Sequence, residues 1–126
     1  MKYFYIAIGG ATGSILRHMS SSWLSGWMIG SQFPWGTFIV NLSGSFIIGL
    51  IAGFNQVNPM SPNMRLFLFT GLLGGFTTYS SYALETFTLL RENQSGLAIS
   101  YVLFTSVLGI LFSGLGYLLS QQFLRN

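Results

Sequence analysis

Charged residues are almost absent from this chain, and no other feature limits its possible folds so severely. Lys, Arg, Asp and Glu make up 6% of the 126 residues, whereas about a quarter of a soluble domain is charged. No charged residue lies between Arg17 and Arg65, and none lies between Glu92 and Arg125. Hydrophobic residues make up 51% of the sequence. Such a chain suits a lipid bilayer, and its length allows about four crossings of about 20 residues each.

Charged and polar positions divide the chain into four apolar segments. We expect helices over about residues 3–24, 37–54, 65–90 and 97–119, all within a single integral membrane domain of residues 1–126. The connections are rich in Ser, Trp, Asn and Pro, which suit membrane interfaces and turns. The sequence therefore predicts an all-α membrane protein with four transmembrane helices.

The third of these segments is expected to be a helix broken near mid-membrane. Its centre contains Gly71, Gly74 and Gly75, followed by Thr77 and Thr78. Glycine costs about 1 kcal/mol relative to Ala inside a helix, and Thr hydroxyls bond to the backbone in competing conformations. In lipid, a broken helix persists only where buried protein or a water-filled cavity satisfies the freed backbone groups.

The distribution of basic residues favours neither orientation of the chain in the membrane strongly. Four crossings place Lys2, Arg65 and Arg125 on one side of the membrane, and the connections with Arg17 and Arg91 on the other. The positive-inside rule predicts orientation from this difference in Lys and Arg, and a difference of one residue gives almost no preference. If the chain inserts both ways, the natural assembly is an antiparallel dimer with a two-fold axis in the membrane plane.

Pairs of glycine four residues apart predict close packing of helices. This spacing lets helix backbones approach one another in membranes. Whether the pairs pack helices within one chain or across a dimer is left open by the sequence. The pairs are Gly9/Gly13, Gly49/Gly53 and Gly71/Gly75.

Three polar residues lie in segments where burying a polar group in the bilayer costs free energy, and each has two interpretations. Asn41 either makes an interhelical hydrogen bond or offers its amide donor to an anion. Glu85, the only acidic residue inside a segment, belongs either to a functional site or to the membrane interface. Arg17 either extends to the headgroups or lines an entrance for anions.

Two tyrosines directly after the expected break offer another way to attract an anion. Tyr79 and Tyr82 are three residues apart, so they share one face of a helix. Aromatic ring edges carry partial positive charge. An edge turned toward a pore can therefore favour an anion without the desolvation cost of a full cation.

The sequence contains no recognisable catalytic arrangement. It lacks Cys, and its one histidine, His18, cannot build a metal site alone. There is no carboxylate pair, no Ser/His/Asp set and no phosphate-binding loop. The five basic residues are scattered rather than clustered, which argues against a nucleic-acid partner. We expect neither an enzyme nor a nucleic-acid-binding protein.

Three local patterns together resemble the Fluc (CrcB-like) fluoride channels over essentially the whole chain. They are GGATGSILR at residues 9–17, GTFIVN at 36–41 and GGFTTYSSY at 74–82, with Glu85 behind the last. The resemblance implies a fluoride-selective, multi-pass channel of the plasma (inner) membrane that exports fluoride passively and so reduces its toxicity. It also implies a dual-topology antiparallel homodimer in lipid, or a heterodimer with a homologue.

The resemblance also implies roles for individual residues. Backbone carbonyls of Gly74 and Thr77 from both subunits would hold a structural sodium ion (Na+) on the two-fold axis, and Asn41 would face the fluoride pathway. Tyr79 and Tyr82 correspond to the family's two pore-lining Phe residues, and this departure puts conductance in question more than fold. The complete set expected along the ion pathway is Asn41, Tyr79, Tyr82, Thr78, Ser80, Ser81, Glu85 and Arg17.

Two other functions remain as alternatives at this stage. A small multidrug-resistance-like proton-coupled transporter also has four helices, but it needs a membrane-embedded carboxylate in its first helix, and the first segment has none. A non-transport membrane assembly subunit would pack against a larger complex and conduct nothing by itself.

Overall fold

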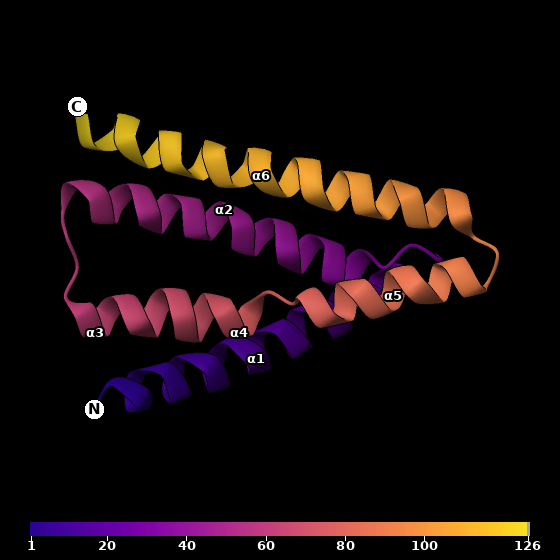
Figure 1. The fold of residues 1–126 in the computed structure, drawn as a ribbon, viewed down its shortest axis with the longest axis horizontal. Helices are drawn as coiled ribbons and strands as arrows, with labels where there is room; N and C mark the ends of the chain where they lie inside the picture. The colour runs from indigo at the N-terminus through magenta and orange to yellow at the C-terminus, as the bar shows by residue number, and fades with distance from the viewer. Residues whose placement is uncertain (126) are drawn as a thin grey trace.

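The computed structural model describes residues 1–125, which form helices joined by short connections (Figure 1). An all-α fold with four helical segments, as the sequence predicts, is confirmed. The third segment consists of four successive pieces, of which η1 is a π-helix. The elements are α1 (Lys2–Trp27), α2 (Trp35–Val57), α3 (Pro62–Arg65), η1 (Leu66–Leu73), α4 (Gly74–Phe76), α5 (Tyr79–Arg91) and α6 (Ser95–Arg125).

The chain runs along the long axis of the molecule four times (Figure 1). Both termini lie at one end, together with the connection between α2 and α3, and the turns after α1 and α5 lie at the other end. Helix α2 packs mainly against α6, while α1 packs against η1 and α4. The elements therefore form two pairs, with α5 completing the third segment beside α6 and α2.

Polar side chains fix the beginnings of two elements in the third segment. The Ser61 hydroxyl accepts the N–H of Met64 at 3.3 Å, and Pro62 follows as the first residue of α3. The Thr78 hydroxyl accepts the N–H of Ser81 at 3.2 Å at the start of α5. Such caps satisfy amide groups that have no partner inside their own helix.

The glycine pairs pack helices of the same chain against one another. A Cβ atom added to Gly13 would lie 2.0 Å from the carbonyl oxygen of Leu72, and one added to Gly49 would lie 1.9 Å from that of Ser113. These approaches are possible only without side chains, so the pairs bring α1 against η1 and α2 against α6. The glycines in such contacts are Gly9, Gly13, Gly49, Gly53, Gly71 and Gly75.

Large apolar side chains are exposed along most of the surface, and the buried core is small. On α6, Ile110 is 75% exposed and Leu118 is 64% exposed. Extended apolar surface of this kind is rare on soluble monomers. Helices α2 and α6 are also long and apolar enough to cross a bilayer. The buried cluster consists of Phe38, Leu42, Leu89, Ala98 and Tyr101.

Arg17 lies inside α1, within the helix expected over residues 3–24, and not in the connection to which the count of basic residues assigned it. Helix α1 continues to Trp27, ten residues or about 15 Å beyond Arg17. No proline occurs between the two, and the first left-handed residue after α1 is Gly30. The Ser-rich stretch therefore extends the helix instead of ending it.

The chain leaves the helical conformation at Thr77 and Thr78. Thr77 has φ −80° and ψ 156°, and Thr78 has φ −145° and ψ 121°, so both are extended. The helical run that begins at Pro62 ends at Phe76, and α5 starts at Tyr79. This two-residue interruption lies within the glycine- and threonine-rich stretch and organises the polar groups described next.

Candidate functional site

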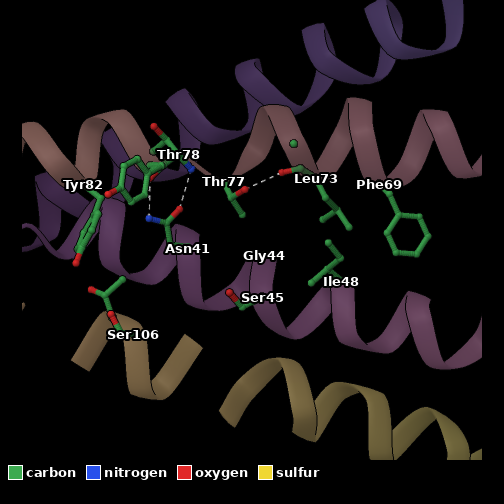
Figure 2. A pocket seen from close by; sticks show the side chains of 13 residues that line it. Asn41, Gly44, Ser45, Ile48, Phe69, Leu73, Thr77, Thr78, Tyr82 and Ser106 are labelled. Carbon is green, nitrogen blue, oxygen red and sulfur yellow. Dashed lines mark hydrogen bonds between the residues drawn. The ribbon is translucent and has the colours of Figure 1, made fainter. Parts of the chain in front are cut away.

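Asn41 of α2 holds the backbone at the interruption with both ends of its side-chain amide. The Thr78 N–H donates to Asn41 Oδ1 at 2.8 Å, and Asn41 Nδ2 donates to the Thr78 carbonyl oxygen at 3.0 Å (Figure 2). The interhelical hydrogen bond of the first interpretation is therefore present. An NH2 group has two donors, and within residues 1–125 the second has no acceptor, so it is left for a ligand.

The interruption leaves carbonyl groups without helical partners. In a continuous helix, the Thr78 N–H would donate to the Gly74 carbonyl and the Ser81 N–H to the Thr77 carbonyl. Here Thr78 donates to Asn41, and Ser81 donates to the Thr78 hydroxyl. Among the residues that the structure describes, the Gly74 and Thr77 carbonyls accept no hydrogen bond. They lie at the negative end of one helical run, beside the positive end of α5.

A cavity of about 420 Å³ lies beside this interruption, between α2, the third segment and α6 (Figure 2). It brings together most of the predicted residues and adds the hydroxyls of Ser45, Thr105 and Ser106. Phe69, Ile48 and Leu73 supply apolar walls. The predicted residues that line it are Asn41, Gly74, Thr77, Thr78, Tyr79 and Tyr82.

The two tyrosines share one side of this cavity. Their ring centroids are 5.7 Å apart, and the Tyr82 ring lies 5.2 Å from that of Tyr101. Tyr79 is 80% exposed. The part of the chain covered by the structure offers no hydrogen-bond partner to the Tyr79 or Tyr82 hydroxyl. Both hydroxyl groups are therefore available to solvent, to a ligand or to another copy of the chain.

A second cavity of about 230 Å³ adjoins the first at Thr78, which lines both. Arg17, Ser81 and Glu85 line this second cavity. The buried Thr78 side chain, 8% exposed, therefore lies between the first cavity, whose lining is mainly apolar, and the second, whose lining is mainly polar. A third cavity of about 240 Å³ shares Glu85 with the second. Polar lining thus continues from the helix interruption toward the ends of α1 and α5.

Glu85 joins three helices through hydroxyl groups. Its carboxylate accepts the Thr37 hydroxyl at 2.6 Å and the Tyr101 hydroxyl at 2.8 Å. Both donors are buried. No Lys or Arg side chain among residues 1–125 forms an ion pair with it. The half-buried Glu85 side chain therefore connects α5 to α2 and α6.

Ser80 is set apart from the other predicted residues. Its hydroxyl oxygen lies 3.4 Å from that of Thr78, but the side chain is exposed and lines none of the three cavities. Ser81, one residue further, faces the second cavity. The direction of α5 after its cap explains the difference, because successive helical side chains point about 100° apart.

Sequence reasoning missed five hydroxyl groups of the site, those of Thr37, Ser45, Tyr101, Thr105 and Ser106. Thr37 precedes Asn41 by one helical turn, and Tyr101 precedes Thr105 by the same spacing, so each pair shares a helix face. Polar residues at this spacing in otherwise apolar segments were the available signal. Thr105 is unusual because its buried hydroxyl oxygen has no hydrogen-bond partner.

The apolar helices, their exposed apolar faces and the hydroxyl- and amide-bearing cavities between them are features of a small helical membrane protein. A family model described as "CrcB-like protein, Camphor Resistance (CrcB)" matches residues 4–117. The chain belongs to this family, and the resemblance seen in its sequence motifs is confirmed.

Relatives of the chain carry a common description, "Fluoride-specific ion channel FluC". The protein of Thermus thermophilus is 44% identical over 116 residues, which cover 92% of this chain and 91% of the relative. That of Aquifex aeolicus is 44% identical over 120 residues, covering 94% and 96%. That of Helicobacter acinonychis is 42% identical over 124 residues, covering 98% of each.

Proposed function

We propose that this chain is a fluoride-selective ion channel that lets fluoride leave the cytoplasm passively and so reduces fluoride toxicity. The description of its relatives as fluoride-specific channels supports this function. One structural observation carries it: hydrogen-bond donors line two cavities that meet at Thr78, uncharged donors in the cavity beside the helix interruption and Arg17 in the second. Neither a catalytic role nor the two alternative functions is favoured by membership of this family.

The chemistry of the lining fits a small, strongly hydrated anion. Such an ion leaves water only if hydrogen-bond donors replace the lost water molecules. The free N–H of Asn41 and the unpartnered hydroxyl of Thr105 supply donors. The ring edges of Tyr79 and Tyr82 and the N-terminal end of α5 add partial positive charge. Because these groups are neutral, the ion is bound weakly enough to move on.

Arg17 has a different place in the proposed pathway. It lines the second cavity and not the one beside the helix interruption. A fixed positive charge there raises the local concentration of anions before they meet the neutral donors. We therefore assign Arg17 to the entrance of the pathway and Asn41 to its narrow interior.

The proposed channel crosses the plasma (inner) membrane four times, through α1, α2, the run from α3 to α5, and α6. The interruption at Thr77 and Thr78 then lies near mid-membrane. We propose an antiparallel homodimer in lipid, and a heterodimer with a homologue is the other possible assembly. The 80% exposure of Tyr79 beside the cavity supports a second copy that completes this wall.

A sodium ion is the proposed partner of the free carbonyl groups. The residues present fit it, since the Gly74 and Thr77 carbonyls accept no bond within the described chain and lie at the C-terminal end of a helical run, where cations are stabilised. Gly74 is also exposed, so a second subunit can approach it. The ion would supply positive charge that offsets the carbonyl dipoles meeting at the two-fold axis.

The direct test is fluoride efflux from vesicles that contain the purified protein. We expect electrode-detected release of fluoride, without any pH gradient, when a potassium ionophore compensates charge. Chloride release under the same conditions should stay near that of empty vesicles. Fluoride flux that requires a proton gradient would instead indicate a coupled transporter. Absence of any flux would indicate an assembly subunit and overturn the proposal.

A further inference from the structure

Two side chains at the helix interruption accept hydrogen bonds from backbone N–H groups. In a continuous helix, these N–H groups would donate to the carbonyl oxygens proposed as cation ligands. The Thr78 N–H, which belongs to the Gly74 carbonyl in a continuous helix, donates to Asn41 at 2.8 Å. The Ser81 N–H, which belongs to the Thr77 carbonyl, donates to the Thr78 hydroxyl at 3.2 Å. The two diverted amides are those that a continuous helix would give to the Gly74 and Thr77 carbonyls; within residues 1–125, the Gly75 and Phe76 carbonyls accept no hydrogen bond either.

We propose that Asn41 and Thr78 are positioning residues for the cation site, and that they create it by diverting these two amides. This inference rests on the proposed sodium site. It gives Asn41 a second task besides facing fluoride, because one end of its amide fixes the backbone while its free N–H remains in the cavity. The same side chain thereby connects the anion pathway to the cation site.

Asn41 also determines which carbonyls remain outside the ligand set. Its Nδ2 donates to the Thr78 carbonyl at 3.0 Å, so that oxygen is already satisfied. The Leu73 carbonyl is satisfied as well, because the N–H and the hydroxyl of Thr77 both donate to it at 3.0 Å. The open oxygens, those of Gly74 and Thr77 among them, therefore lie between residues 73 and 78, which limits the stretch of backbone where a cation can bind.

Without either side chain, we expect the backbone at residues 77 and 78 to become helical, so that the interruption disappears. A buried amide without a partner is strongly disfavoured. Gly74 already has helical angles, with φ −62° and ψ −35°. An unpartnered Thr78 N–H can therefore return to the Gly74 carbonyl after a change at only two extended residues. The carbonyl would then be occupied by an amide, and sodium would have to compete with it.

The test measures sodium binding by four variants of the full-length protein in detergent, with N-methylglucamine as the replacement cation. Thr78→Val removes the hydroxyl at nearly constant shape, while Thr78→Ser keeps it. Thr86→Val is the matched control, because its hydroxyl donates within α5 to the Tyr82 carbonyl at 2.8 Å. Binding is followed with radioactive sodium and by the sodium dependence of the unfolding temperature.

We expect Thr78→Val to need at least about tenfold more sodium for half-saturation than the wild type. Thr78→Ser and Thr86→Val should stay within about threefold of the wild-type value. Asn41→Ala, which frees the Thr78 amide directly, should weaken sodium binding as Thr78→Val does. Fluoride flux through Thr78→Val should recover as sodium is raised, because the weakened site is then filled.

Wild-type sodium affinity in folded Thr78→Val or Asn41→Ala would overturn this inference while leaving the proposed sodium site intact. A Thr78→Val protein that aggregates at every sodium concentration, while Thr86→Val folds, would also overturn it, because Thr78 would then be a general structural residue. A wild-type protein that binds no sodium would remove the site itself and this inference with it.

Discussion

The buried hydroxyl group of Thr105 has no evident role in the stability of the fold. Its hydroxyl oxygen is buried and unpartnered among the described residues, although buried hydroxyl groups are nearly always hydrogen-bonded. It lines the same cavity as Asn41 and Tyr82. A donor that gains a partner only from a passing anion would explain why the cost of leaving it unpartnered is tolerated.

Thr105→Val should separate stability from function. Valine has nearly the same shape and removes the unpartnered hydroxyl, so the free energy of unfolding should stay unchanged or rise by about 1 kcal/mol. Fluoride flux should fall by about tenfold, because one donor is lost from the pathway. Thermal unfolding in detergent and vesicle efflux measure the two effects. A variant that is destabilised but conducts normally would show that the hydroxyl is structural.

The hydroxyl groups of Tyr79 and Tyr82 are expected to be less important than their rings. Neither hydroxyl has a protein partner within residues 1–125, and the ring edges keep their partial positive charge in Phe. Tyr79→Phe and Tyr82→Phe, alone and together, should retain fluoride flux within about threefold of the wild type or raise it. The fluoride electrode provides the measurement. Loss of flux in the double variant would show that the hydroxyls bind the ion directly.

Helix elements are held together by backbone contact at glycine, and the sequence spacing identified these contacts without identifying their partners. Gly9 and Gly13 pack against η1, and Gly49 packs against α6. A repeat of small residues marks a surface of close approach, but it contains no information about which helix approaches. The choice depends on the order of helices in space, which only the structure provides.

Gly13→Ala tests this contact, and Gly10→Ala in the same helix is its control. A Cβ at Gly13 would lie 2.0 Å from a backbone oxygen of Leu72, whereas one at Gly10 meets nothing within 4 Å. We expect Gly13→Ala to lower the free energy of unfolding by about 1 to 3 kcal/mol through overpacking. Gly10→Ala should be neutral or stabilise by up to about 1 kcal/mol. Equal unfolding temperatures for the two variants would contradict the packing described for α1.

The candidate site was predictable wherever a polar residue stood out in apolar sequence. Asn41, Thr78 and Glu85 stood out in this way, and the structure places each of them in the lining of one of the two adjoining cavities or both. Thr105 and Tyr101 did not, because hydroxyl residues are common in membrane helices and their roles depend on the neighbours that α6 meets. Hydrogen-bond partners 37 residues apart, such as Asn41 and Thr78, follow from tertiary packing and not from spacing.

The molecule as a whole has four passes with both termini at one end (Figure 1). Because Arg17 lies within α1 and lines a cavity, the basic residues near the helix ends are Lys2, Arg65 and Arg125 at one end and Arg91 at the other. The charge bias is therefore larger than the sequence tally suggested. An antiparallel dimer requires copies of the chain in both orientations in spite of this bias. Changing the orientation therefore tests whether the dimer is antiparallel.

Two variants of opposite charge bias can test the antiparallel assembly. Asn58→Lys with Gln122→Lys gives five basic residues at the end with the termini against one at the other end. Gly26→Lys and Gly96→Lys, combined with Lys2→Gln and Arg65→Gln, give three at the other end against one, all at exposed positions. Each variant should force one orientation, so fluoride flux from either variant alone should fall at least about tenfold, because parallel copies cannot complete each other's pathway. Co-expression should restore flux, since the two variants then insert in opposite directions. Full flux from each variant alone, with its termini labelled on a single side, would show that one orientation suffices and that the dimer is not antiparallel.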